Sequence, residues 1–536
     1  MKNILLFLFT VFSVPLVAQS QEHAWVYFTD KADVATSIAN PTTILTQRAI
    51  DRKNAHNIPI DARDVPVNET YITTVKNQSG IEVKAKSKWF NCVHVIGSIQ
   101  DINALSGFTF VDHIDFADTN LNTRIATTDQ QQFVDKNLDT QVDFTYGDSA
   151  NQVEMLHVDY LHENDFTGEG MLVAIMDSGF PQVNTLIAFD RVRNNNDLVG
   201  GYDFVDRTDD YDAFTGSSHG TSVFSDMAGF LQDEFVGTAP DAGYYLFRTE
   251  DVSSETPVEE SYWVEAAERA DSLGVDVINT SLGYQTYDNP NYSYTPSDMD
   301  GNTAFISRGG NIAVEKGILV VTSAGNSGNN SNFPVIGAPA DGNVYAVGAV
   351  NQDEIYASFS SIGPSADGRI KPDGMAQGAL AVIINTNGNT ALSNGTSFSS
   401  PIMAGAITSF WQANPQRTNL EIMQMVRESS HLYNNPTNQM GYGIPNFQTA
   451  LDDLLNTVSY EEQTVKVYPN PVSELLHIQK NNLDHLDLKI YNLLGKLVFK
   501  AEKVSEEINL ASLSSGVYIA KFETENFQKS LKIIKQ

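Results

Sequence analysis

The chain has 536 residues, 41% of them hydrophobic and 18% charged, and its formal net charge is −33. This length exceeds what one hydrophobic core normally serves, so several domains are expected. Such strong acidity excludes nucleic acid and anionic membrane surfaces as general partners, because both are themselves negatively charged.

The acidic excess lies in the middle of the chain. Residues 141–459 hold 11 Lys and Arg against 41 Asp and Glu, whereas residues 460–536 hold 10 of each kind. The simpler interpretation is a well-hydrated surface, and the alternative is that some carboxylates bind structural calcium. Asp298 and Asp300 are candidate ligands, although they lack the spacing and the terminal glutamate of an EF-hand. No metal site is therefore identified, and calcium stays a hypothesis.

The first 20 residues are typical of a secretory signal peptide. Lys2 precedes an apolar run from Ile4 to about Ala18, which is shorter than the ~20 residues of a membrane span. We therefore expect a secreted or cell-surface protein without a membrane span. Cys92 is the only cysteine, so no intramolecular disulfide can form, and we expect its side chain to be a small buried apolar group.

Residues 22–118 predict a small α+β module. Strand-like runs at Trp25–Phe28 and Cys92–Ile96 flank a predicted helix over Thr43–Asn57, and a second short helix is expected from Ile102. Residues 119–150 are polar and weakly periodic, which is typical of a linker.

Residues 151–455 alternate strand and helix patterns, which is typical of a parallel sheet with helices on both faces. The predicted strands are Met171–Met176, Gly243–Phe247, Val275–Ile278, Ile318–Thr322 and Val344–Val350. The predicted helices are Thr221–Gly229, Val258–Leu273, Ala304–Glu315, Ser397–Ala413 and Leu420–Ser429. Thr418 and Glu421 have the spacing of a capping box for the last helix.

Residues 461–536 alternate apolar and polar side chains, as in a small antiparallel β sandwich. Their Tyr-Pro-Asn-Pro opening at Tyr468, the Tyr-Asn-Leu-Leu-Gly-Lys turn from Tyr491 and the Leu-Ser-Ser-Gly-Val-Tyr strand resemble the C-terminal sorting domain of type IX secretion substrates. That resemblance implies the type IX secretion machinery as a partner. The alternative is a carbohydrate- or surface-binding sandwich.

Three separated segments each place a reactive residue type beside glycine. They contain Asp177 in Met-Asp-Ser-Gly, His219 in Ser-His-Gly-Thr-Ser, and Ser397 in Gly-Thr-Ser-Phe-Ser-Ser-Pro. A neutral serine hydroxyl needs a base to take its proton and a carboxylate to orient that base. The order Asp, His, Ser along the chain is the order found in subtilisin. Together the segments resemble the subtilisin-like serine proteases.

This resemblance implies a serine endopeptidase that acts on protein and peptide substrates, is made as a precursor and needs no cofactor. The implied fold is α/β, with a subtilisin-like parallel sheet between two helix layers, preceded by a small α+β propeptide-like module that inhibits the enzyme and followed by a small β sandwich. Asn326, in Ala-Gly-Asn-Ser-Gly, would donate to the oxyanion. The implied substrate-binding residues are Ser281, Leu282, Gly283, Ala324 and Gly325.

The similarity stops at Tyr284, where the family usually has a small residue. Tyr287, Tyr292 and Tyr294 follow in an apparent insertion up to about Asn302. These tyrosines either narrow the substrate cleft or pack the insertion onto the surface, and the sequence leaves both alternatives open.

Two other functions remain open. Gly216–Gly220 also satisfies the Gly-x-Ser-x-Gly pattern of α/β-hydrolases, which would make the chain an esterase with Ser218 as nucleophile. That motif requires a preceding strand, whereas the acidic Asp209–Asp212 stretch precedes it here. The other alternative is a non-catalytic surface or adhesion protein on a protease scaffold.

Overall fold

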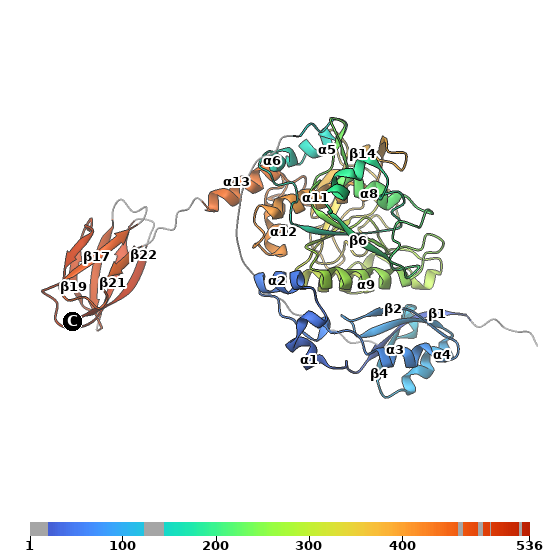
Figure 1. Ribbon diagram of the computed structural model, residues 1–536, viewed down its shortest axis with the longest axis horizontal. Helices are drawn as coiled ribbons and strands as arrows, with labels where there is room; N and C mark the ends of the chain where they lie inside the picture. Colours follow the sequence, from blue (N-terminus) through green and yellow to red (C-terminus); the bar gives the residue numbers. More distant parts are fainter. Residues whose placement is uncertain (1–19, 123–143, 459–464, 481–485, 494, 525–527) are drawn as a thin grey trace, which may run out of the picture. The chain divides into compact units, whose positions relative to one another are not determined.

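The computed structural model describes residues 20–122, 144–458, 465–480, 486–493, 495–524 and 528–536 (Figure 1). Nearly all of the predicted signal peptide, and the greater part of the predicted linker at 119–150, lie outside these residues. The chain forms two compact units, Met1–Leu451 and Asp452–Gln536. Among the described helices, none combines the length and the apolar composition of a membrane span.

A seven-stranded sheet with order β13-β12-β11-β10-β5-β9-β6 forms the centre of the first unit, and all of its neighbouring strands are parallel. The side chains of its central strands are buried on both faces, as expected of a parallel sheet covered by helices. The strands are β5 (Leu172–Asp177), β6 (Leu198–Asp203), β9 (Gly243–Arg248), β10 (Val277–Thr280), β11 (Leu319–Ser323), β12 (Tyr345–Val350) and β13 (Gly374–Gln377).

Helices cover both faces of this sheet. α9 and α10 pack together on one face, and α8 and α11 pack together on the other, with α11 reaching from β10 to β13 (Figure 1). The helices of this domain are α5 (Ala150–Glu154), α6 (Val158–Glu163), α7 (Asp190–Asn194), α8 (His219–Ala228), α9 (Val258–Leu273), α10 (Phe305–Glu315), α11 (Thr396–Gln412), α12 (Asn419–Glu428) and α13 (Phe447–Val458). Two hairpins complete it, β7 (Phe230–Leu231) with β8 (Phe235–Val236) and β14 (Ala381–Ile384) with β15 (Thr390–Ser393).

The predicted α/β fold is confirmed, and each of the five predicted strands and five predicted helices has a counterpart within two residues at either end. The capping box of α12 is also present, because Thr418 accepts from the Glu421 N–H and Glu421 accepts from the Thr418 N–H. The sequence analysis did not identify the two edge strands β6 and β13. Two of six residues in β6 are glycine, and β13 has only four residues, so neither carries a recognisable strand pattern.

The N-terminal module is an antiparallel sheet of order β2-β3-β1-β4 with helices on one side. Val26, Val93, Val95 and Ile102 contribute fully buried side chains to its core. Cys92 is buried as predicted, and burial raises the pKa of its thiol. The elements are β1 (Glu22–Phe28), α1 (Val34–Ala39), α2 (Gln47–Ala55), α3 (Glu69–Lys76), β2 (Ile81–Ser87), β3 (Cys92–Gly97), α4 (Ile99–Ala104) and β4 (Val111–Phe116).

The predicted ends of two helices in this module were wrong. The helix predicted over Thr43–Asn57 is shorter, because the Thr46 hydroxyl accepts from the Ala49 N–H and caps α2 at Gln47. The helix expected from Ile102 begins at Ile99, because Ser98 caps it by accepting from the Asp101 N–H. In both cases a local side-chain cap, which apolar periodicity does not reveal, sets the first residue.

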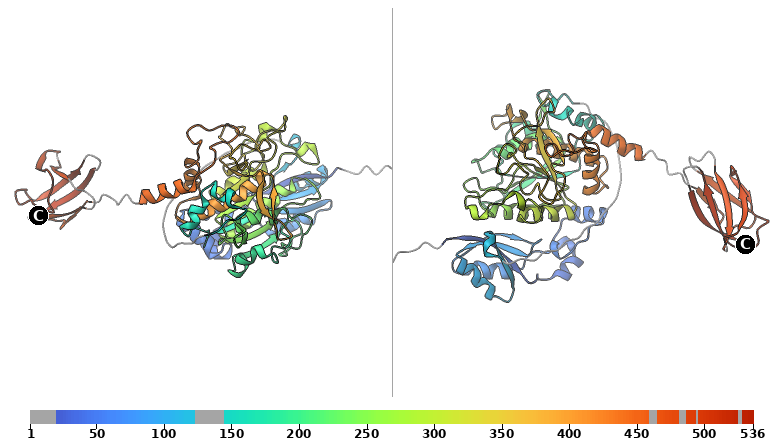
Figure 2. Two further views of the ribbon diagram at one scale, coloured as in Figure 1. Left: turned by 90° about the horizontal axis from the view of Figure 1, so that it is seen from above. Right: turned by 180° about the vertical axis from the view of Figure 1, so that it is seen from behind.

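The N-terminal module packs against α9 of the sheet domain. β2 and α2 both contact α9, and the views in Figure 2 show the module beside this helix. Trp25 of β1 stacks on Phe305 at the start of α10 with ring centroids 4.6 Å apart, and its indole N–H donates to the Ser261 hydroxyl. The module thus covers the helix layer of the sheet domain with apolar and hydrogen-bonded contacts.

The second unit contains the predicted small antiparallel β sandwich. A three-stranded sheet of order β16-β17-β20 and a four-stranded sheet of order β19-β18-β21-β22 enclose a core that includes Leu476, Leu488 and Phe522. The strands are β16 (Val465–Tyr468), β17 (Leu475–Lys480), β18 (Asp487–Asn492), β19 (Leu497–Ala501), β20 (Glu507–Asn509), β21 (Gly516–Glu523) and β22 (Gln528–Lys535).

Candidate active site

Asp177 is the last residue of β5 and is fully buried at the carboxyl end of the sheet. Ligand sites of open α/β sheets form at this edge. The Asp177 Oδ1 atom accepts from the Ser178 N–H at 2.7 Å, and both carboxylate oxygens lie within 3.0 Å of His219 Nδ1. These contacts hold the carboxylate against the imidazole.

His219 begins α8, 2.8 Å from Asp177 Oδ1 through its Nδ1 atom. A carboxylate only accepts hydrogen bonds when ionised, so Nδ1 carries the proton and Nε2 is left as the acceptor of the neutral ring. Burial lowers the pKa of His219, but the charge of Asp177, its hydrogen bond and the charge of Glu250 together raise it above the usual 6.5. The ring is therefore positioned to take up a proton on Nε2.

Ser397 is the second residue of α11. Its Oγ donates to the Ser281 carbonyl at 3.1 Å, and the Ser281 Oγ donates to the Ser397 carbonyl at 2.8 Å. The preceding Gly395 has φ 151°, a conformation that side-chain-bearing residues rarely adopt, and it turns the chain from β15 into α11. These contacts hold the start of α11 against the end of β10.

Asn326 follows β11 and is exposed. Its Oδ1 accepts from the Thr396 N–H at 2.9 Å and from the Thr396 hydroxyl at 3.0 Å. A backbone N–H can only donate, so this contact fixes the oxygen of the amide on the Thr396 side. The Nδ2 group is consequently directed away from Thr396 and can donate to another molecule.

One cavity of about 200 Å³ gathers seven of the nine predicted site residues, whereas Asp177 and His219 do not line it. Its lining contains Ser397, Asn326 and all five predicted substrate-binding residues. It also contains Gln285, Ser323, Ser327 and Gly337, which the sequence analysis did not identify. Gln285 lies in the apparent insertion, where the family resemblance gives no guide, and no local pattern distinguishes the other three.

The tyrosines of the insertion pack it onto the body of the protein, which was the second of the two alternatives. Tyr287 and Tyr294 both donate to Glu260 Oε1, at 2.6 and 2.7 Å, while Tyr284 donates to Glu250. Tyr284 and Tyr287 are almost completely buried. Buried phenol–carboxylate hydrogen bonds thus anchor this segment.

Glu250, Glu255 and Glu259 form an acidic group whose ligand atoms lie within 4.8 Å of one another, close enough in geometry for a cation. Burial and the neighbouring carboxylates raise the pKa of Glu250 to about 8 and that of Glu259 to about 10. Asp298 and Asp300, the candidate calcium ligands, instead accept hydrogen bonds within their own turns, from Thr295 and Thr303 respectively.

The arrangement required for an esterase elbow is not met. β6 ends at Asp203, and α8 begins at His219 directly after Ser218, so no strand leads directly into the motif. The resemblance of Gly216–Gly220 to that motif is therefore a coincidence of glycine and serine spacing.

The family of the sheet domain makes this chain a serine-type endopeptidase. Residues 168–443 match the Subtilase family, residues 23–134 match the peptidase S8 propeptide domain of Bacteroidota, and residues 466–536 match the secretion system C-terminal sorting domain. The chain therefore belongs to the subtilase family, and it is a secreted or cell-surface protein made as a precursor.

Curated relatives match about half of this chain. Subtilisin NAT of Bacillus subtilis subsp. natto is 32% identical over 293 residues, covering 54% of this chain and 68% of that one. Subtilisin of Bacillus pumilus is 32% identical, covering 54% of this chain and 94% of that one. The solved structure of MycP1 from Mycobacterium smegmatis is 21% identical, covering 60% of this chain and 89% of that one, with a TM-score of 0.45.

The His219 environment leads to a titration prediction. We expect a histidine resonance that titrates above pH 6.5 and disappears in His219→Gln. In Asp177→Asn the charge of Asp177, the largest cause that raises the pKa of His219, is lost while burial still lowers it, so the midpoint should fall. Because the pKa of His219 is higher in the folded than in the unfolded protein, its protonation stabilises the folded protein below about pH 6.5. This contribution to stability is lost as the pH rises through the folded-state pKa. NMR with labelled histidine measures both midpoints, and an unchanged midpoint in Asp177→Asn would contradict the assignment.

Proposed function

We propose that this chain hydrolyses peptide bonds through Asp177, His219 and Ser397 by way of an acyl-enzyme intermediate. One observation carries the proposal: a single cavity is lined by the Ser397 hydroxyl and the oriented Asn326 amide, while the His219–Asp177 pair lies at the same end of the sheet. Nucleophile, base, orienting carboxylate and oxyanion donor are the four parts that acyl transfer to serine requires.

In the proposed first step Ser397 Oγ attacks the peptide carbonyl while His219 Nε2 takes its proton. The Ser397 hydroxyl bonds to the Ser281 carbonyl in this structure, so it turns toward His219 when substrate is bound. Catalytic hydrogen bonds often tighten only in the substrate complex. Asp177 then stabilises the imidazolium, which returns the proton to the leaving amine.

The negative charge on the attacked carbonyl oxygen needs preorganised donors. Asn326 Nδ2 is one candidate, since Thr396 occupies the amide oxygen. The Ser397 N–H is the second, because it lies in the first turn of the 17-residue α11, where helix N–H groups favour negative charge. Neither donor has to reorganise at the moment of reaction.

The substrate backbone would pair with the segment Ser281–Gly283 as an added strand. Ser281 follows directly after β10, Leu282 is half-buried and Gly283 is exposed, so this segment can offer its main chain to an extended peptide. Ala324 and Gly325 would line the opposite wall of the pocket.

We further propose how the precursor is divided. Residues 1–20 would be the signal peptide, 22–118 the inhibitory propeptide and 119–150 the region cut during maturation. Residues 151–455 would be the catalytic domain and 461–536 the domain read by the type IX machinery. The matches to the propeptide domain and to the sorting domain support this division.

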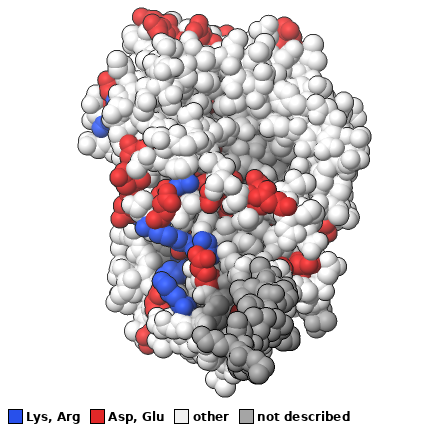
Figure 3. All heavy atoms as spheres, turned by 90° about the vertical axis from the view of Figure 1, so that its right-hand side faces the viewer, with Lys and Arg blue, Asp and Glu red and all other residues white. Residues whose placement is uncertain are grey.

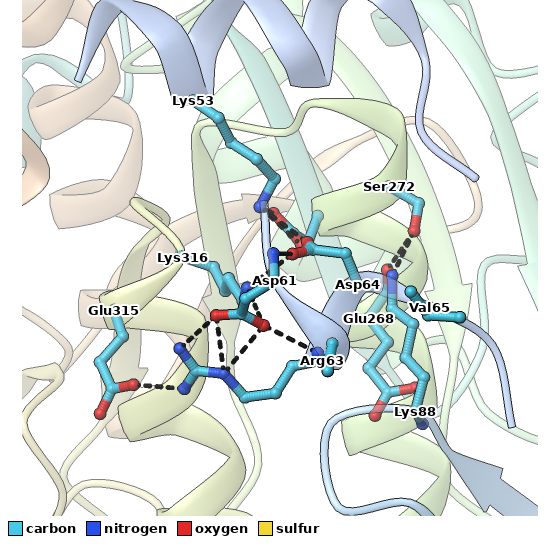
Figure 4. Close-up of polar contacts among 12 residues, drawn as sticks. Lys53, Asp61, Arg63, Asp64, Val65, Lys88, Glu268, Ser272, Glu315 and Lys316 are labelled. Carbon is cyan, nitrogen blue, oxygen red and sulfur yellow. Dashed lines mark hydrogen bonds and ion pairs between the residues drawn. The ribbon is translucent and has the colours of Figure 1, made fainter. Parts of the chain in front are cut away.

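Residues 41–67 of the N-terminal module, called the strap below, form ion pairs with residues of α9 and of the segment after α10. These ion pairs support the proposal that the propeptide stays bound to the sheet domain. Lys53 pairs with Asp271 at 2.8 Å. Figure 4 shows Asp64 between Lys53 and Lys316, with which it pairs at 3.2 and 2.8 Å. All four side chains are almost fully buried. Burial lowers the pKa of Lys53, while Asp271 and Asp64 favour its charged form.

Charge complementarity supports the same role. Residues 22–118 contain nine Lys and Arg against twelve Asp and Glu, which is nearly balanced beside the acidic residues 141–459. On the face in Figure 3, acidic side chains spread over the upper part of the molecule, and the basic ones gather mostly lower down. Arg48 of the strap pairs with Asp276 and Arg63 pairs with Glu315. The module thus supplies cations to an acidic partner.

Ser397→Ala is expected to abolish peptide hydrolysis and to leave the precursor unprocessed. Asn326→Ala should lower kcat by about 10²–10³-fold with little change in KM, since one oxyanion donor is lost. Asn329→Ala, an exposed asparagine of the same loop, is the matched control. Kinetics on processed enzyme measure these effects. If wild-type enzyme is neither labelled by a fluorophosphonate nor active, a non-catalytic surface protein is the better description.

Lys53→Met is expected to destabilise the precursor by about 3 kcal/mol, because it leaves buried carboxylates with fewer cations. Lys76→Met, at an exposed position on α3, should change stability by less than about 0.5 kcal/mol. Both variants are made in a Ser397→Ala background, which keeps the chain uncleaved. Urea unfolding monitored by tryptophan fluorescence then compares their free energies of unfolding. Equal stabilities of the two variants would show that the strap ion pairs do not hold the module.

Deletion of residues 461–536 is expected to stop the protein from reaching the cell surface or the medium in a host with type IX machinery. The signal peptide should still be removed, because the two export steps read different segments. Immunoblots of cell and medium fractions measure this. Normal export of the shortened chain would exclude the sorting role.

A further inference from the structure

The pocket beside Ser397 contains a side chain outside the expected substrate-binding set. Gln285 lines the same cavity as Ser397 and Asn326, together with Ser327 and Gly337. Its possible role rests on the proposed function, in which this cavity receives the P1 side chain, the one belonging to the residue whose carbonyl is attacked.

The backbone around Tyr284 brings Gln285 into the pocket. Tyr284 and Ala338 exchange two main-chain hydrogen bonds, at 2.8 and 3.2 Å, which makes a short antiparallel bridge. Successive side chains of extended backbone point to opposite sides, so the Tyr284 side chain goes to Glu250 and that of Gln285 goes to the cavity. A Cβ at Gly337 would lie 2.9 Å from Gln285 Cγ, so glycine at 337 leaves room for it.

Two hydrogen bonds fix the orientation of the Gln285 amide. Its Nε2 donates to the Val335 carbonyl at 3.1 Å, and its Oε1 accepts from the Ser327 hydroxyl at 2.9 Å. Ser327 is itself held, because its N–H donates to Ser361 Oγ at 3.0 Å. A carbonyl can only accept, so the atom facing Val335 must be the amide nitrogen. The amide therefore presents a defined hydrogen-bonding edge.

One hydrogen-bonding position of this amide remains for a substrate. Nε2 carries two N–H groups, and in the described chain around the cavity only the Val335 carbonyl accepts from it. The half-buried Gln285 side chain lines the cavity, so its second N–H can donate to a P1 acceptor. A site that offers a hydrogen bond discriminates against substrates that cannot make one.

The remainder of the lining has no charge. All of the residues that line the cavity are uncharged. Three of them are glycines, which leave space because they have no side chain. A charged P1 side chain would lose its hydration there without meeting a counter-ion, which is costly. The pocket therefore disfavours lysine, arginine, aspartate and glutamate.

We propose that Gln285 is the residue that sets P1 specificity in this enzyme. It selects uncharged P1 side chains that end in a hydrogen-bonding group, with glutamine ahead of methionine, which has a similar length but only a weak acceptor. Val335 and Ser327 act through Gln285 by fixing its amide.

The test uses processed enzyme and four peptides that differ only at P1, carrying Gln, Met, Glu or Lys. For wild-type enzyme we expect kcat/KM for P1 Gln to exceed that for P1 Met by about tenfold, the value of one net hydrogen bond, and the charged peptides to be poorer still. In Gln285→Met the Gln-to-Met ratio should fall to about one. In Gln285→Glu the Lys-to-Gln ratio should rise by about tenfold or more, since a counter-ion is supplied.

Thr286→Ala is the matched control, because Thr286 directly follows Gln285, is exposed and does not line the cavity. It should keep the wild-type ratios. The rate of labelling by a fluorophosphonate reports an intact Ser397 site without a P1 side chain, and it should be similar in all variants. If labelled Gln285 variants keep the wild-type ratios, the inference is overturned while the proposed function stands. Wild-type enzyme that is neither labelled nor active would overturn both.

Discussion

The parallel register of the central sheet is the constraint on which the site depends. Thr280 of β10 lies beside Met176 of β5 on one side and Thr322 of β11 on the other. The strands therefore end together, and the residues that follow them emerge side by side. Asp177, Ser281 and Ala324 reach the site in this way, while α8 and α11 begin at the same edge and bring His219 and Ser397. Chain segments more than two hundred residues apart thus converge at one edge of the sheet.

The N-terminal module shows how an acidic protein accommodates buried charge. Removing an ion from water costs several kcal/mol, and an ion pair offsets that cost only when partners surround it closely. Around Lys53 the carboxylates of Asp64 and Asp271 lie within 3.2 Å, and Asp64 is shared with Lys316. The carboxylate of Glu268 is satisfied differently, by the N–H groups of Lys88 and Trp89 at 2.8 and 2.9 Å. The buried carboxylates of Asp64, Asp271 and Glu268 are thus each contacted by donors from across the interface or within the strap.

Much of this architecture could be predicted from the sequence. The helix predicted over Val258–Leu273 has the same two ends as α9, and the three glycine-flanked motifs named residues that lie at one edge of the sheet. Other features depend on tertiary contacts that no local pattern encodes. Gln285 enters the pocket because the neighbouring Tyr284 forms a bridge with Ala338, fifty-four residues further along the chain, and the ion pairs of the strap join segments more than two hundred residues apart. Likewise, the hydrogen bond from Ser397 Oγ to the Ser281 carbonyl depends on the side-chain rotamer of Ser397, which a sequence pattern does not reveal.

The buried ion pairs of Asp271 limit which residues can replace it during evolution. In the precursor this carboxylate is sealed between Arg52 and Lys53, whereas on an enzyme that has shed its N-terminal module it would face open solvent. The same side chain must then tolerate two opposite surroundings. An apolar residue in place of Asp271 could pack well in the precursor but would expose a hydrophobic patch on the enzyme without its N-terminal module. The aspartate is therefore a compromise between a tightly bound precursor and a soluble product.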